Sequence, residues 1–82
     1  ISDSDTLALF EGSGVSRSCQ KKEDVFFQMD LKTGRLRGVV LTNFTGLDPQ
    51  SLLVYLRKEG VPLSFLDLID QYHKRLLPVY DA

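Results

Sequence analysis

The stretch DPQSLLVYLRKEGVPLSFLDLIDQYHKRLL, residues 48–77, decides the fold that we expect for this chain of 82 residues. Asp48 is a favoured N-cap residue because its carboxylate can accept hydrogen bonds from the first turn, and Pro49 suits the first helical position. Gly60 can take the left-handed conformation that closes a helix, and Pro62 is best tolerated in the first turn of a new one. The stretch therefore predicts two short helices joined by an elbow at Gly60.

The second of these helices has a wide apolar face. Its apolar residues recur at i, i+3, i+4, i+7 and i+11, namely Phe65, Leu68, Ile69, Tyr72 and Leu76. This spacing places them on one side of an α-helix and predicts that side to be buried. Leu66 and Leu77 lie off the centre of the stripe, so the face is wider than one packing seam requires. The excess is a candidate contact surface.

The composition is typical of one soluble globular domain. Hydrophobic residues make up 43% and charged residues 26% of the chain, and a domain of this size buries only about 60% of its unfolded surface. Ten basic residues against eleven acidic ones give a net charge of −1, which provides no general attraction to a phosphate backbone. We therefore expect no nucleic-acid partner. Because the chain does not begin with methionine, we expect a single interaction domain, residues 1–82, excised from a longer protein.

Cysteine content and hydropathy favour an intracellular location. Cys19 is the single cysteine, which excludes an internal disulfide framework and fits a reducing compartment. No apolar run approaches the length of about 18 residues that a membrane-spanning helix needs, and there is no signal-peptide core. No membrane partner is expected.

The first half of the chain predicts a strand followed by a long connection. Residues 6–10 form a short apolar run that is typical of a strand. Residues 11–24 contain two glycines, three serines and several charges, which favours a mobile loop that contains a weak strand around residues 15–19.

A β-hairpin is expected next. Residues 25–29 and 36–42 read as strands, and Gly34 between them can take the positive φ that closes a short hairpin loop. Together with the two helices, these strands predict an α+β fold, in which a small antiparallel sheet of about three to four strands packs on two C-terminal helices.

Two registers of the hairpin are compatible with the residues. If Asp30 pairs with Arg35, one face is apolar and is formed by Val25, Phe27, Met29, Leu36, Gly38 and Val40. A bulge at Gly34 instead shifts the pairing by one residue and turns Val39 and Leu41 inward.

Residues that carry chemistry are few and isolated. His73 is the only histidine and has no second donor pair at metal-ligand spacing, so we expect a structural or surface histidine. Cys19 lies in a basic loop without an organised base, and Asp67 and Asp70 share a helix face that is expected to be solvated. The GSG run at residues 12–14 lacks the lysine of a phosphate-binding loop. We predict no catalytic residue, no metal and no cofactor.

The C-terminal stretch LLVYLRKEGVPLSFLDLIDQYHKRL, preceded by strand, loop and hairpin, resembles the small RWD-type globular domains of kinetochore proteins. Such domains cap coiled coils in the small subunits of the outer-kinetochore microtubule-binding complex, in monopolin and at the C-terminus of the mitotic-checkpoint Mad protein. The resemblance covers residues 6–77 and rests on apolar spacing around Leu52, Leu53, Leu56, Phe65 and Ile69. It implies an RWD-like sandwich, a coiled coil in the parent chain, and a nuclear or chromosomal location. It also implies a role in cell division, in which the domain dimerises and holds peptide segments of partner proteins.

A second resemblance concerns the middle of the chain. The segments LKTGRLRGVVL and LLVYLRKEGVP are similar to the hairpin and helix of ubiquitin-like β-grasp domains. That fold is the alternative, although it needs further strands where residues 62–77 show helical spacing.

We expect the chain to function as a non-catalytic protein–protein interaction and dimerisation module. It has apolar surface that a partner could cover, and its residues form no recognisable catalytic site. The alternative is a regulatory or ligand-sensing domain of a larger enzyme. Heptads directly upstream in the parent chain would favour docking, whereas a catalytic domain in the same chain would favour the regulatory role.

The predicted partner-binding site lies along the second helix and its C-terminal extension. Tyrosine combines a large apolar body with a polar tip, which suits a surface that is wet until a partner binds. We predict Leu66, Tyr72 and Tyr80 as exposed anchors. Lys74 and Arg75 form a charged rim. In the alternative interpretation, these residues close the core or fix the C-terminal tail.

The wide apolar face leads to a first prediction, that the chain forms a homodimer or pairs with a related domain. Sedimentation equilibrium should show a dimer or a stable pair. A strict monomer at high micromolar concentration, with no partner recovered from cell extract, would contradict it.

Overall fold

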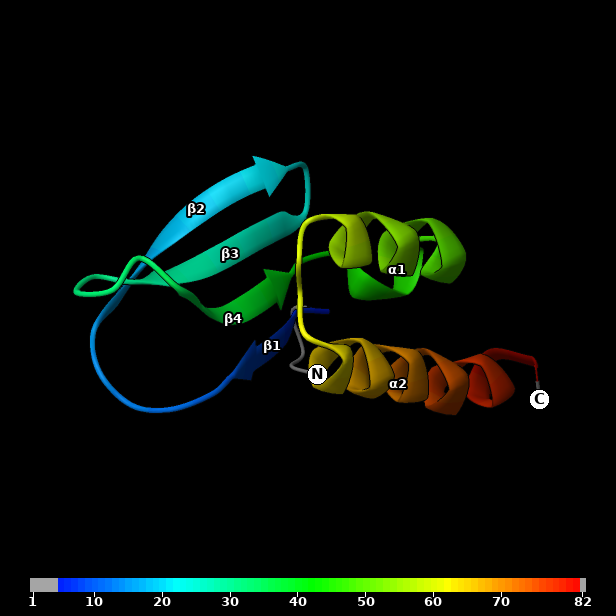
Figure 1. Cartoon of the computed structure of the whole chain (residues 1–82). Helices are drawn as coiled ribbons and strands as arrows, with labels where there is room; N and C mark the ends of the chain where they lie inside the picture. The colour runs from blue at the N-terminus through cyan, green and yellow to red at the C-terminus, as the bar shows by residue number, and fades with distance from the viewer. Residues whose placement is uncertain (1–4, 82) are drawn as a thin grey trace. The chain divides into compact units, whose positions relative to one another are not determined.

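The computed structural model describes residues 5–81, with the side chains of residues 5–75. In chain order its elements are β1 (Leu7–Phe10), β2 (Ser16–Lys22), β3 (Val25–Asp30), β4 (Leu36–Leu41), η1 (Phe44–Gly46), α1 (Pro49–Lys58) and α2 (Leu63–Asp81) (Figure 1). The chain divides into two compact units, one up to residue 44 and one from residue 45. The sheet belongs to the first unit and both α-helices to the second.

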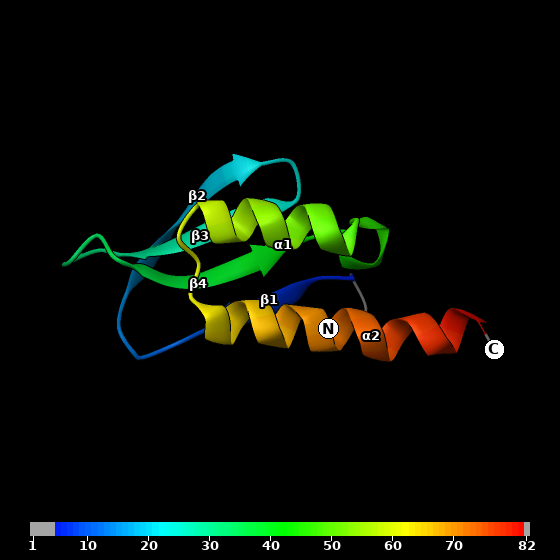
Figure 2. The ribbon, with the colours of Figure 1, turned by 45° about the vertical axis from the view of Figure 1, so that its right-hand side comes forward.

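The first unit contains a four-stranded antiparallel sheet with the strand order β1-β4-β3-β2 (Figure 2). β1 and β2 are therefore its two edges. Two helices follow the sheet in the chain, which confirms the predicted α+β fold and sets the number of strands at four. The β-grasp alternative needs strands after α1, but residues 63–81 are helical instead.

The prediction of a mobile loop over residues 11–24 is wrong for most of that segment. The strand expected within it, around residues 15–19, is confirmed and is longer than predicted, because β2 covers Ser16–Lys22. Most side chains of this strand are exposed, so its sequence needs no apolar alternation. The strand is held in place by its backbone ladder with β3. The connection between β1 and β2 is limited to residues 11–15.

The hairpin of β3 and β4 combines both predicted registers. Near the turn, the N–H of Asp30 donates to the carbonyl of Arg35 at 2.8 Å, as the first register requires. The register then shifts by one residue, so that Phe27 pairs with Val39. The bulge turns the side chains of Val39 and Leu41 to the buried face of the sheet, as the second register requires. Its extra residue is Arg37 and not Gly34.

One face of the sheet carries the buried side chains of the first unit. Residues that pair directly lie on the same side of a sheet. The register thus groups five buried residues on this face, namely Leu7, Val25, Phe27, Val39 and Leu41. Their burial is the main apolar contribution of the sheet to stability.

Gly38 is required by a close approach between β4 and β1. A Cβ atom at this position would lie 2.5 Å from the carbonyl oxygen of Leu9 and 2.8 Å from Cδ1 of Phe10. Both distances are shorter than van der Waals contact, so a side chain here would force the strands apart. The ring of Phe10 lies over the glycine on the outer face of the sheet and is 57% exposed.

Both ends of α1 follow the signals in the sequence. Asp48 is the N-cap and accepts a hydrogen bond from the N–H of Ser51 at 2.9 Å. At the other end Gly60 has a φ of 89°, and the N–H of Val61 donates to the carbonyl of Leu56 at 3.0 Å. This is the hydrogen bond of a Schellman motif, so the predicted cap and elbow are confirmed.

The buried face of α2 includes Phe65 and Ile69, as predicted, but it is rotated about the helix axis from the predicted stripe. Its buried side chains, among those that the structure describes, are Phe65, Leu66, Ile69 and His73. At about 100° per residue, these positions fall within an arc of roughly 100°. Leu68 falls outside this arc and is 39% exposed, so the prediction that it is buried is wrong.

The rotation of α2 can be tested by comparing two truncations on the same helix. Ile69 is fully buried, and Ile69→Ala should lower the free energy of unfolding by about 2–5 kcal/mol because it leaves a cavity. Leu68→Ala should cost less than about 1 kcal/mol. Urea unfolding measures both, and equal losses in the two variants would contradict the observed orientation.

Candidate functional site

A groove lies between α1 and α2 in the second unit. It has a volume of about 280 Å³ and is lined by Leu53, Val54 and Arg57 from α1 and by Leu63, Leu66, Asp67 and Asp70 from α2. The two helices lie side by side and are joined by the short elbow after α1, as Figures 1 and 2 both show. The elbow therefore brings two helix faces together that are separate in the sequence.

Two large apolar side chains of the groove remain in water. Val54 is 67% exposed and Leu63 is 66% exposed, whereas Leu66, which also lines the groove, is only 7% exposed. Exposed apolar groups beside a concave apolar surface are the kind of surface that a protein partner covers.

Charges of opposite sign line the two sides of the groove. Arg57 is contributed by α1, and Asp67 and Asp70 are contributed by α2. Asp70 accepts a hydrogen bond from Lys74 at 2.9 Å, and this contact raises the pKa of Lys74. A bound segment would meet a cation on one wall and carboxylates on the other.

The structure brings only part of the predicted partner site to this groove. Leu66 lines it, but its burial contradicts the exposed anchor that we predicted. Tyr72 is half-buried, and the guanidinium carbon of Arg75 lies 5.7 Å from the centre of its ring, in a cation–π contact. Lys74 forms the salt bridge within α2. The side chain of Tyr80 lies outside the described residues.

The apolar spacing of the two helices does not single out the two exposed groove residues, Val54 and Leu63. Val54 lies off the stripe that buries Leu52 and Leu56, and Leu63 is the first residue of α2. A signal was present for Val54, because a branched apolar residue about 200° around the helix from Leu52 must either meet another element or stay in water.

In the first unit, Arg37 ties the β1–β2 connection to the hairpin. Its Nε and Nη2 atoms donate to the carbonyl oxygen of Glu11 at 3.3 and 3.2 Å, and Nη1 lies 3.8 Å from Oδ2 of Asp30. A Cβ atom at Gly14 would lie only 3.0 Å from Nη1, so a glycine lets the connection close over the guanidinium group. The side chain of Arg37 is 12% exposed, and its contacts indicate a structural role.

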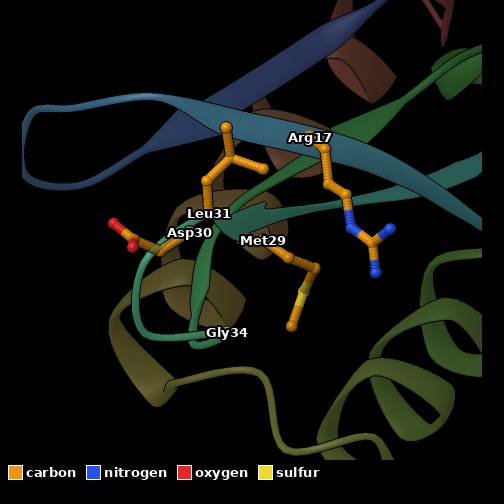
Figure 3. Close-up of a pocket in the computed structure, with 5 residues that line it drawn as sticks. All are labelled: Arg17, Met29, Asp30, Leu31 and Gly34. Carbon is orange, nitrogen blue, oxygen red and sulfur yellow. The ribbon is translucent and has the colours of Figure 1, made fainter.

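A second hollow, of about 360 Å³, lies beside the turn of the hairpin and is lined by Arg17, Met29, Asp30, Leu31 and Gly34 (Figure 3). Figure 3 shows the side chains of Arg17 and Met29 extending to the same side, in keeping with their pairing between β2 and β3. This hollow is open and mixed in polarity, and it adjoins the start of the edge strand β2.

The single histidine and the single cysteine lie in different units. His73 is 5% exposed. Hydrogen bonds from Ser51 lower the pKa of Asp48, and the nearby charge of His73 lowers it further. Cys19 is half-buried on β2. Among the described residues there is no group of three or more His, Cys, Asp or Glu that could hold a metal ion.

Comparison with known proteins gives no match for this chain, whether with family models, curated proteins or solved structures. The RWD-type resemblance therefore stays a prediction from the sequence. None of the described helices is long and apolar enough to cross a membrane.

The carboxylate of Asp30 gives the hairpin turn a pH dependence that can be measured. Its Oδ1 accepts from the N–H groups of Thr33 and Lys32 at 2.9 and 2.8 Å. These hydrogen bonds, with a smaller effect of the Arg37 charge, lower the pKa of Asp30 from its ordinary value of 3.8. A lowered pKa stabilises the fold fully above the unfolded value, and this stabilisation is lost as the pH falls through the folded value.

We therefore expect Asp30→Asn to flatten part of the acid-induced loss of stability. Melting temperatures of wild type and variant, followed from about pH 6 to about pH 2, should converge in the acid range because the wild type loses the charged turn there. A constant difference between the two curves throughout this range would contradict the assignment.

Proposed function

We propose that this chain is a non-catalytic protein–protein interaction module, and that the groove between α1 and α2 docks a short apolar segment of a partner protein. The exposure of Val54 and Leu63, at 67% and 66%, supports this proposal most directly. A partner that covers these side chains removes apolar surface from water.

The charges of the groove suggest the chemistry of the docked segment. Its apolar anchor would lie over Leu66, between the two exposed side chains. An acidic residue on one side of the anchor would meet Arg57, and a basic residue on the other side would meet Asp67. Rim charges of this kind fix orientation and raise the rate of association more than they raise affinity.

The RWD-type resemblance supplies a narrower form of the proposal. In that form the partner is another kinetochore protein, the chain dimerises with a copy of itself or a related domain, and the complex acts in the nucleus. This extension rests on the sequence resemblance, whereas the proposed groove rests on the contacts of α1 and α2. The two can therefore fail separately.

Peptide selection followed by calorimetry tests the groove. Short random peptides would be selected against the wild-type chain and titrated into Val54→Asp and Leu63→Asp. Because each substitution places a charge in the apolar site, we expect affinity to fall by about tenfold or more, which corresponds to about 1.4 kcal/mol. The substituted side chains are mostly exposed, so the melting temperature should change little.

Leu68→Asp is the matched control, since Leu68 lies on the same helix, is 39% exposed and does not line the groove. It should keep wild-type affinity. The proposal is contradicted if this control weakens binding as much as the groove variants do, or if no peptide with an apolar anchor is selected.

A further inference from the structure

β2 uses only one side of its backbone for pairing within the sheet. It is the last strand in the order β1-β4-β3-β2 and contains seven residues. The N–H of Leu31 donates to the carbonyl of Val15 at 3.2 Å, so these two residues form a hydrogen-bonded pair in the ladder with β3. Because such pairs alternate along an antiparallel ladder, Arg17 and Cys19 also direct their N–H and C=O groups toward β3.

Ser16, Ser18 and Gln20 consequently direct their backbone N–H and C=O groups away from β3. The pairing on the opposite side of β3 agrees with this alternation, since the N–H of Asp30 donates to the carbonyl of Arg35 at 2.8 Å. In the part of the chain that the structure describes, no other strand pairs with the outer edge of β2. This edge therefore presents alternate donors and acceptors at the spacing that an added strand requires.

The side chains of β2 are cationic on one side of the sheet. The register places Arg17 and Lys22 on the same side, because both pair with residues of one β3 face. Lys21 follows Arg17 and Cys19 by simple alternation and lies on the same side, with its ammonium nitrogen 5.5 Å from the ring centre of Phe27. The register shift after Gln20 is what brings Lys22 to this side. The strand has the sequence SRSCQKK and contains no acidic residue.

The acidic residues nearest in sequence, Glu23 and Asp24, lie in the turn beyond the end of β2. The carboxylate of Asp24 accepts a hydrogen bond from the hydroxyl of Thr42 at 2.7 Å. The backbone carbonyl of Asp24 accepts a second one from the N–H of Thr42 at 3.0 Å. This carboxylate is therefore held at the end of β4. It does not lie along the outer edge that begins at Ser16.

We propose that the outer edge of β2 binds an extended acidic peptide segment by β-strand addition. The outward N–H and C=O groups of Ser16, Ser18 and Gln20 form the ladder, and carboxylates at alternate positions of the segment lie opposite Arg17 and Lys21. A second copy of the same edge is disfavoured, because its basic residues would face those of the first copy. Charge therefore selects the acidic segment. This site belongs to the first unit, so it does not depend on the groove between α1 and α2.

The test uses a fluorescent peptide of alternating glutamate and threonine and measures its binding to the whole chain by anisotropy. A lysine–threonine peptide is the control for charge. The same acidic peptide, N-methylated at alternate backbone amides, is the control for strand addition because it cannot form the ladder. We expect the acidic peptide to bind, and both control peptides to bind at least about tenfold more weakly.

Three variants separate the backbone contribution from the charge contribution. Ser18→Pro removes an outward N–H while the ladder with β3 is kept, which an edge strand tolerates, and it should weaken binding by about tenfold or more. Ser18→Thr keeps the N–H and should bind like the wild type. The double substitution Arg17→Gln and Lys21→Gln should also weaken binding and reduce its dependence on salt.

The proposal is overturned if the wild-type chain does not bind the acidic peptide at millimolar concentration. It is also overturned if the N-methylated peptide binds as well as the unmodified one, since binding would then need charge alone. This second comparison uses the wild-type chain, so it stays decisive even if Ser18→Pro fails to fold.

Discussion

The bulge at Arg37 is the constraint on which the rest of the sheet depends. Beyond it Phe27 pairs with Val39, and the extra residue turns the following side chains of β4 by one position. Without it, Val39 and Leu41, both fully buried, would point to the outer face of the sheet. Arg37 is itself held by the carbonyl of Glu11, so the connection after β1 helps to keep the bulge in place.

The second unit depends on a different local constraint, the elbow at Gly60. Its positive φ lets the chain leave α1 with a Schellman hydrogen bond and enter α2 within a few residues. The two helices then share a groove in which Val54 and Leu63 stay in water. In both units, a backbone feature of one or two residues decides which side chains are available to a partner.

The parts of the fold that local chemistry determines could be predicted from the sequence. Asp48 as a cap, Gly34 in the hairpin turn and Gly60 at the elbow act on their own neighbours, and the structure confirms all three. Features that depend on pairing were not predictable in the same way. The strand character of β2 comes from its ladder with β3. Arg37, the extra residue of the bulge, donates to a carbonyl that is distant in the sequence.

The candidate site, too, could be predicted from the sequence only in part. The apolar spacing of α2 correctly predicted a buried helix face, but Leu66 and Leu68 exchange their expected roles, because the centre of that face depends on what each side of the helix meets. The partner residues predicted near the end of α2 therefore differ from the exposed residues of the groove. The spacing of apolar residues identifies a helix, but it does not determine how the helix is rotated about its own axis.

The ladder of β2 with β3 leaves one side of the β2 backbone, from Ser16 to Gln20, without a partner strand among the described residues. Amide hydrogen exchange of the free chain, followed residue by residue with NMR, tests this most directly. Along β2 we expect protection to alternate, with slow exchange at Arg17 and Cys19 and fast exchange at Ser16, Ser18 and Gln20. Uniformly fast exchange would show that this segment is a loop, and the reverse alternation would show that the register is shifted by one residue.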